Sequence, residues 1–206
     1  HPPGLFLFFH GLINLCQSSE PISTFLDKTR PASFEEALDV IASNSMRSHP
    51  PRILAPLDRR VLWLATLIVM SLASLTVIPL YGLLCRTNSP AISWLCAALW
   101  PTLPAVTIFI PKSDAAFPFI AVLLLWCWLK AWDRKSIFYS VFAGLIFWCG
   151  LMCSLAFIPV LLVAGLMSFG SELISYLLDG NKNGDDSEKC RGQFSYLHAV
   201  CIFAAV

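Results

Sequence analysis

The longest uncharged segments of this chain decide what it can fold into. Residues 61–85 carry no charge at all, and residues 136–178 carry one, Glu172. The hydrocarbon core of a bilayer is about 30 Å thick, and a helix needs about 20 apolar residues to cross it. Backbone inside that core must satisfy its own hydrogen bonds, which a helix does. The sequence therefore predicts an all-α, polytopic transmembrane protein.

The composition excludes two classes of protein. Hydrophobic residues make up 57% of the 206 residues, charged residues make up 13%, and the mean hydropathy is +0.70. Soluble proteins carry roughly 25% charged residues. The net charge of +1 gives no positive field that would attract a polyanion. We therefore expect neither a water-soluble globule nor nucleic acid as a partner.

About five spans are expected within residues 61–178. Residues 61–85 form the first, and residues 115–132 form another of 18 residues. Residues 91–110 are also uncharged, and Pro101 and Pro104 should bend them because proline lacks a backbone N–H. The remaining two spans come from residues 136–178.

The segment 136–178 is too long for one crossing. A helix of that length would measure about 65 Å, twice the membrane. It must fold back on itself, and we expect the turn between Cys149 and Pro159, because Gly150 is permissive and Pro159 disfavours continuation of the preceding helix. The sequence thus predicts two antiparallel helices here.

Four regions lie outside these spans. Residues 1–16 should form an interfacial helix after a His1-Pro2-Pro3-Gly4 entry, because their apolar run is too short to cross a membrane. Residues 17–60 are a polar extramembrane excursion, and residues 179–195 are a polar loop. Residues 196–206 read as the start of a truncated span, so we expect the chain to be a fragment.

One amphipathic helix is predicted in the excursion. Ser33 and Glu36 have the spacing of a capping box, which places the start of the helix at Ser33. Apolar residues then recur at helical spacing, at Phe34, Ala37, Leu38, Ile41 and Ala42. Acidic residues lie opposite this stripe, so we expect protein rather than anionic lipid to cover it.

Charged residues at the ends of the spans are the candidates for chemistry. Asp114 lies between two apolar runs with Lys112 two residues before it, which predicts a polar site at the membrane rim. A solvated hairpin that merely faces headgroups is the alternative. Arg59 and Arg60 open the first span, where they could anchor to headgroups or bind a substrate phosphate. The dense basic cluster at residues 130–135 favours an orientation with Asp114 outside.

In the order of the chain, four features resemble the GT-C integral-membrane glycosyltransferases, which include protein O-mannosyltransferases and aminoarabinose lipid A transferases. The first two are His1-Pro2-Pro3-Gly4 before an apolar helix, and residues 76–81 in a helix that ends at Arg86. The third is the proline-containing run 99–114, which has an acidic end and is followed by a helix that ends near Lys130. The fourth is the glycine-containing segment 144–159. The resemblance covers most of residues 1–178.

The resemblance implies an enzyme of a bacterial inner membrane. Its activity would be transfer of a sugar from a polyprenyl-phosphate donor to a lipid, glycan or protein acceptor at the extracytoplasmic face. Asp114 would orient the acceptor or a divalent cation, and Lys112, with His1, Arg59 and Arg60, would contact the donor. The family's main catalytic acid precedes the His-Pro-Pro segment, and Lys112 stands where arginine is frequent.

Two other classes of function remain open from the sequence. A transporter or flippase would carry charged residues or broken helices near the middle of the bilayer. The polar residues here gather at the ends of nearly charge-free spans, which favours chemistry at the surface over passage through the membrane. A membrane scaffold without a small-molecule site is the third possibility.

Overall fold

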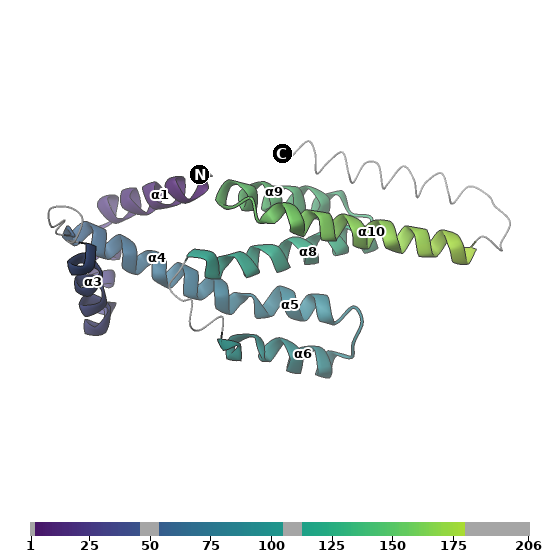
Figure 1. Ribbon diagram of the computed structural model, residues 1–206, viewed down its shortest axis with the longest axis horizontal. Helices are drawn as coiled ribbons and strands as arrows, with labels where there is room; N and C mark the ends of the chain where they lie inside the picture. The colour runs from purple at the N-terminus through teal and green to yellow at the C-terminus, as the bar shows by residue number, and fades with distance from the viewer. Residues whose placement is uncertain (1–2, 46–53, 105–112, 180–206) are drawn as a thin grey trace.

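The computed structural model describes residues 3–45, 54–104 and 113–179, and these residues form helices joined by short connections, with no strand among them (Figure 1). The predicted all-α class is confirmed for this part of the chain. The elements are α1 Gly4–Ser18, α2 Glu20–Thr29, α3 Ala32–Ser45, α4 Pro56–Leu75, α5 Val77–Leu84, α6 Pro90–Ala98, η1 Trp100–Thr102, η2 Ser113–Ala116, α8 Phe117–Arg134, α9 Ile137–Cys153 and α10 Phe157–Asp179.

Two helical segments are long and apolar enough to cross a membrane. They are Pro56–Leu84, with 29 residues, and Ser113–Arg134, with 22 residues. Both overlap spans that the sequence predicts, at 61–85 and 115–132. Length and composition are the criteria here, and a buried helix of a soluble protein also meets them.

The first of these segments is interrupted at Thr76, between α4 and α5. Pro79 follows three residues later and cannot donate a backbone hydrogen bond, which is a common cause of a break in a helix. Thr76 is fully buried, and its hydroxyl donates to the carbonyl of Leu72 at 3.1 Å. The indole Nε1 of Trp100 donates to the carbonyl of Ala73 at 2.8 Å. These side chains satisfy backbone groups next to the break.

The structure modifies the prediction of a bent span at 91–110. Helix α6 ends at Ala98 and passes into the short 3₁₀ helix η1, so the described part of this segment is not one continuous helix. The reason is the pair Pro101 and Pro104, which remove two backbone donors within four residues. Residues 105–112 lie outside the described residues.

The predicted fold-back of residues 136–178 is confirmed. Helix α9 ends at Cys153 and helix α10 begins at Phe157, within the predicted interval. The hydroxyl of Ser154 accepts a hydrogen bond from the N–H of Ala156 at 3.2 Å. Gly150 is required here by packing rather than by its backbone conformation, since a Cβ added to it would lie 2.8 Å from the ring of Phe157.

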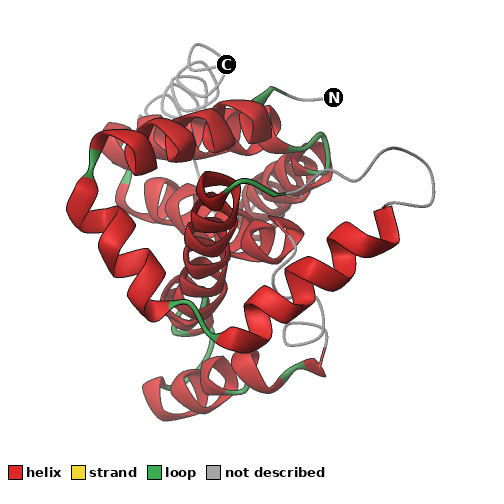
Figure 2. Ribbon diagram, turned by 90° about the vertical axis from the view of Figure 1, so that its left-hand side faces the viewer, coloured by secondary structure: helices red, strands yellow, loops and turns green. Residues whose placement is uncertain are grey.

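Two apolar cores hold the helices together. The larger joins α8, α9 and α10, and its buried members include Leu124, Cys127, Ala143, Phe147 and Phe157. Helices α8 and α9 form the most extensive helix pair. The smaller core joins α1, α2 and α4 through Leu12, Cys16, Leu26, Val61 and Ala65. This core packs α1 and α2 against the N-terminal half of α4, and α3 lies at the same end of the molecule, the end that faces the viewer in Figure 2.

The start of the amphipathic helix differs from the prediction. Helix α3 begins at Ala32, so Ser33 lies inside its first turn and is not the N-cap. The carbonyl of Pro31 accepts the N–H groups of Phe34 and Glu35, at 3.1 and 3.4 Å, and so takes part in the capping that the sequence assigned to Ser33. The neighbouring side chain of Glu35 pairs with Arg30 and Arg59.

Protein covers only part of the apolar stripe of α3. Leu38 is buried, and the ring of Phe34 lies 5.0 Å from the ring of Trp63 on α4, measured between centroids. Ala37 and Ile41 are exposed. The expected protein cover is therefore present at the end of α3 nearest α4 and incomplete farther along.

Candidate functional site

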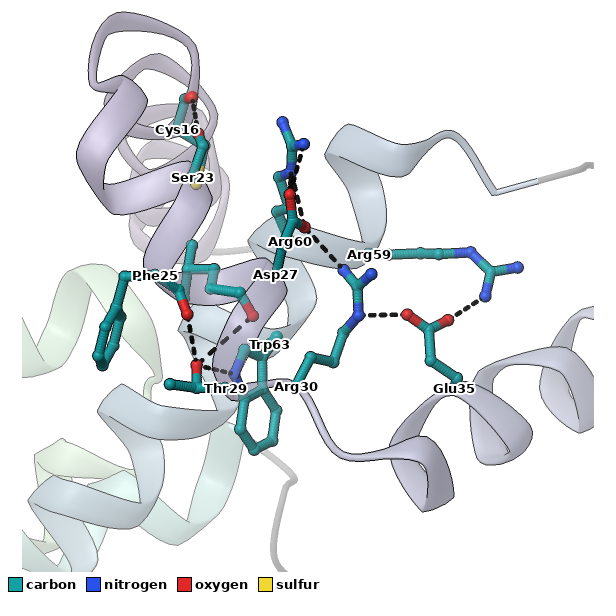
Figure 3. Close-up of polar contacts among 11 residues, drawn as sticks. Cys16, Ser23, Phe25, Asp27, Thr29, Arg30, Glu35, Arg59, Arg60 and Trp63 are labelled. Carbon is teal, nitrogen blue, oxygen red and sulfur yellow. Dashed lines mark hydrogen bonds and ion pairs between the residues drawn. The ribbon is translucent and has the colours of Figure 1, made fainter.

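Arg60, at the beginning of α4, makes a two-nitrogen contact with Asp27 on α2. Its Nη2 lies 2.6 Å from Oδ2, and its Nε lies 3.0 Å from Oδ1. Paired contacts between a planar guanidinium and a carboxylate fix orientation as well as distance. This contact joins two residues 33 positions apart and fastens α2 to α4 (Figure 3).

The pairing continues through Arg30 to α3. Arg30 follows α2 and lies 3.5 Å from Asp27 between Nη1 and Oδ1, and its Nε contacts Oε1 of Glu35. Glu35 accepts a second contact, from Nη1 of Arg59. Nη2 of Arg59 contacts Oδ1 of Asp39 at 2.7 Å, one turn farther along α3. Arginines and carboxylates therefore alternate without a gap from α4 through α2 to α3.

We call this set of six residues the ion-pair network: Asp27, Arg30, Glu35, Asp39, Arg59 and Arg60. It contains three arginines and three carboxylates, so its formal charge is zero. Its side chains are partly exposed. Solvated pairs of this kind each contribute little to stability, and networks with paired geometry contribute more. Its chief structural consequence is that α2 and α3 are held at the start of α4.

The network shifts the pKa values of several of its members, and neutral hydrogen bonds join the same helices. The Arg60 guanidinium, through its hydrogen bond, lowers the pKa of Asp27 below its usual value. Nε1 of Trp63 donates to the hydroxyl of Thr29 at 3.2 Å, again between α4 and α2. The hydroxyl of Ser23 donates to the carbonyl of Cys16 at 2.7 Å and joins α2 to α1. These contacts orient the same helices as the ion pairs do.

Arg59 and Arg60 are thus already engaged in ion pairs, unlike the arginines of an open phosphate-binding site. The sequence predicts that these two arginines contact lipid headgroups or a substrate phosphate. In the structure, carboxylates of this chain contact both guanidinium groups. A phosphate at either arginine would have to compete with these carboxylates. The geometry supports a positioning role for both residues.

Asp114 lies in η2, directly before α8. Its side chain is exposed, while Ala116 in the same turn is buried. The turn packs against both α4 and α8. An acidic side chain near the N-terminal end of a helix is stabilised by the helix dipole. Asp114 is therefore a carboxylate that faces outward at the end of an apolar helix, and it is not part of the ion-pair network.

The opposite end of α8 is basic. Nη2 of Arg86, after α5, contacts Oδ1 of Asp133 at 2.7 Å. Arg134 and Lys135 follow, and both are exposed. Nζ of Lys130 lies 4.2 Å from the ring centroid of Trp126. The two ends of α8 therefore differ in charge.

Two predicted site residues, His1 and Lys112, lie outside the described residues. The divalent cation that the resemblance implies would need oxygen or nitrogen ligands. Among residues 3–45, 54–104 and 113–179, no group of three or more His, Cys, Asp or Glu side chains is arranged to hold a metal ion. The part of the site that the structure describes is therefore Asp114, Arg59 and Arg60.

Sequence reasoning missed Asp27 and Arg30, because it did not predict α2. A signal for this helix was present, since Glu20 and Pro21 are residue types that favour the first turn. The spacing of Asp27 and Arg30, three residues apart, and of Glu35 and Asp39, four apart, also puts each pair on one helix face. Comparison with known proteins adds no assignment, since no family model, curated protein or solved structure matches this chain.

Proposed function

We propose that this chain is the membrane-embedded part of a GT-C-type glycosyltransferase, which transfers a sugar from a polyprenyl phosphate to a lipid, glycan or protein acceptor at the extracytoplasmic face. The observation that carries the proposal is the position of Asp114, an exposed carboxylate at the N-terminal end of the apolar helix α8. A donor whose charged headgroup stays at the membrane surface would meet a carboxylate at that position.

Exposed apolar surface supports insertion of more than two helices. On α9, the large side chains of Phe138, Val141, Phe142, Leu145 and Trp148 are all at least 40% exposed. On α10, Leu162, Val163, Leu166, Met167 and Phe169 are exposed to a similar degree. Contiguous apolar surface of this kind is unfavourable in water and favourable against lipid tails. We therefore include α9 and α10 among the membrane spans, in a bacterial inner membrane.

Sugar transfer needs a base for the acceptor hydroxyl and a group that stabilises the negative charge on the departing phosphate. A positioned carboxylate can deprotonate or orient an acceptor hydroxyl, which contributes typically 10²–10⁴-fold to a rate. In this proposal Asp114 orients the acceptor, and Lys112 stabilises the lipid phosphate as it leaves. The resemblance assigns the main catalytic acid to a residue ahead of His1.

The ion-pair network has a supporting part in this proposal. It holds α2 and α3 at the start of α4, and η2, the turn that carries Asp114, packs against the same helix farther along (Figure 1). A substrate bound at Asp114 would therefore lie against a helix whose N-terminal end is held in place. Rigid placement of groups around a reacting centre lowers the entropic part of a barrier.

The direct test is the sugar-transfer rate of Asp114→Asn. The full-length protein is reconstituted in vesicles with a panel of radiolabelled polyprenyl-phosphate hexoses, and transfer to lipid, glycan and peptide acceptors is counted. We expect the variant to lose about 100-fold or more in rate. Glu36→Gln is the matched control, since it removes an exposed carboxylate on α3 and should keep the parental rate. Parental transfer by Asp114→Asn would exclude Asp114 from the site.

A further inference from the structure

We propose that the basic end of the helix bundle, at the α8–α9 turn, binds the phosphate of an anionic phospholipid through Lys130, Arg134 and Lys135. We call these three residues the basic rim. This inference depends on the membrane insertion in the proposed function, and not on the sugar-transfer chemistry. It concerns the end of α8 opposite Asp114.

The first observation is an imbalance of charge. Arg86 and the basic rim place four cations at this end, and Asp133 is the one carboxylate within α8 and α9. Asp133 pairs with Arg86 at 2.7 Å. No ion pair joins Lys130, Arg134 or Lys135 to a carboxylate among residues 3–43, 54–104 and 113–170, whose side chains the structure describes. The ion-pair network at the other end balances three arginines with three carboxylates.

The second observation is the placement of the Lys130 ammonium group. Nζ lies 4.2 Å from the ring centroid of Trp126 and 5.8 Å from that of Tyr139. Aromatic faces attract a cation through their electron density, and they leave its N–H groups available to oxygen acceptors. Lys130 lies about one turn before the end of α8, from where a lysine side chain can reach headgroup depth. Its charge is therefore held in position next to the turn.

The third observation is the apolar surface that adjoins the basic rim. Ile137 and Phe138, directly after the turn, are 56% and 73% exposed. The rings of Phe138 and Phe142 stack along α9 with centroids 6.4 Å apart. A phospholipid presents its phosphate and its acyl chains at adjacent depths. The basic rim and this aromatic surface match that arrangement.

The occupant that fits is a phospholipid with net negative charge. Lysine and arginine donors both bind phosphate oxygens, and arginine does so with paired hydrogen bonds. A zwitterionic lipid brings its own cation and gains less from three positive side chains. Basic residues at the end of a helix also stabilise its dipole, irrespective of the lipid present. Stabilisation of the helix dipole does not depend on the lipid, whereas phosphate binding does, so changing the lipid composition separates the two roles.

The test uses the full-length protein in bilayers of dioleoylphosphatidylcholine that contain brominated dioleoylphosphatidylglycerol or brominated dioleoylphosphatidylcholine. Bromine quenches tryptophan fluorescence at short range, and Trp126, Trp128 and Trp132 lie on the same helix as Lys130. The ratio of quenching by the two lipids gives the preference for the anionic one. Flotation of the vesicles measures insertion separately.

We expect the parental protein to prefer phosphatidylglycerol and the triple variant Lys130→Gln, Arg134→Gln, Lys135→Gln to lose that preference. Each cation near an anionic surface changes affinity by about five-fold, so the expected loss is about 100-fold. The charge-preserving variant Arg134→Lys, Lys135→Arg should keep most of the preference. Equal preference in the parental and triple-variant proteins would overturn the inference. Failure of the parental chain to float with vesicles would overturn membrane insertion as well, whereas loss of sugar transfer alone would not affect the inference.

Discussion

Arg60 contacts the carboxylate of Asp27 through both Nη2 and Nε, at 2.6 and 3.0 Å, and so joins α4 to a helix that precedes it by about 30 residues. The contact is the first link of the ion-pair network, which continues through Arg30 and Glu35 to Arg59. It explains why the two polar helices α2 and α3 have a fixed position beside the apolar helix α4.

We expect the Asp27–Arg60 pair to couple in a double-mutant cycle. Asp27→Asn, Arg60→Gln and the double variant are compared with the parental protein in detergent micelles, and the free energy of unfolding is followed by circular dichroism. Because the guanidinium and the carboxylate make a two-nitrogen contact, the cycle should give a stabilising coupling between them, reduced by their exposure to solvent. Glu36→Gln combined with Arg60→Gln is the control pair and should be additive. A coupling near zero for Asp27 and Arg60 would contradict the network.

The same pair predicts a pH dependence at its acidic side. The pKa of Asp27 is lowered in the folded protein by the hydrogen bond from Arg60. The stabilisation is therefore complete above the unfolded aspartate pKa of about 3.9, and it is lost as pH falls through the folded value. The difference in stability between the parental protein and Asp27→Asn should be constant from pH 7 to pH 5 and should shrink below pH 4. A difference that grows as the pH falls would show the opposite sign.

Glycine substitutions should divide into two classes. A Cβ added at Gly4 would lie 2.5 Å from the carbonyl oxygen of Met152, and one at Gly150 would lie 2.8 Å from the ring of Phe157. Gly4→Ala and Gly150→Ala should each destabilise the protein by about 1–3 kcal/mol, because tightly packed helices must move apart.

Gly11→Ala and Gly165→Ala are the matched controls for these substitutions. Both glycines lie within helices, and a Cβ at either has no atom within 4 Å. Alanine there should stabilise the protein by about 0.5–1 kcal/mol, since it lowers the entropic cost of the helix. Thermal melts of all four variants give the comparison. Equal effects in the two classes would be inconsistent with the close approach of α1 to the end of α9.

Ser168→Ala should destabilise the contact between α8 and α10. Nε1 of Trp128 donates to the Ser168 hydroxyl at 2.6 Å in a buried environment. Removal of the acceptor leaves a buried indole N–H with one partner fewer, which costs about 1–3 kcal/mol. Ser71→Ala removes an exposed hydroxyl and should change the free energy of unfolding by less than about 0.5 kcal/mol. Similar melting temperatures for the two variants would refute the role of this hydrogen bond.

The apolar helices could be predicted from the sequence because their signal is local. The lengths of the uncharged segments predict helices that overlap Pro56–Leu84 and Ser113–Arg134. Residues 136–178 are too many for one crossing, which predicts the turn before Phe157. Pro101 and Pro104 had a larger effect than predicted, since α6 ends at Ala98. The sequence cannot decide whether two such prolines bend a helix or end it, because the answer depends on neighbouring side chains.

The ion-pair network could not be predicted, because its signal is not local. Helix α2 has ten residues, too few for a stable isolated helix, and it depends on burial of Leu26 and on pairing of Asp27 with Arg60. Arg59 and Arg60 were identified as functional candidates from their position before a span. Their partners lie 20 to 33 residues earlier in the chain, so only the folded arrangement identifies them.

In the proposed topology, Asp114 lies at the extracytoplasmic end of the membrane-spanning helix α8, and the basic rim lies at its cytoplasmic end. Asp114→Cys and Lys135→Cys place thiols at the two ends of α8, about 30 Å apart along the helix axis. A membrane-impermeant maleimide is applied to intact and permeabilised cells, with the parental protein as the reference for its native cysteines. We expect Asp114→Cys to be labelled in intact cells and Lys135→Cys to be labelled only after permeabilisation. Labelling of Lys135→Cys but not Asp114→Cys in intact cells would contradict this topology.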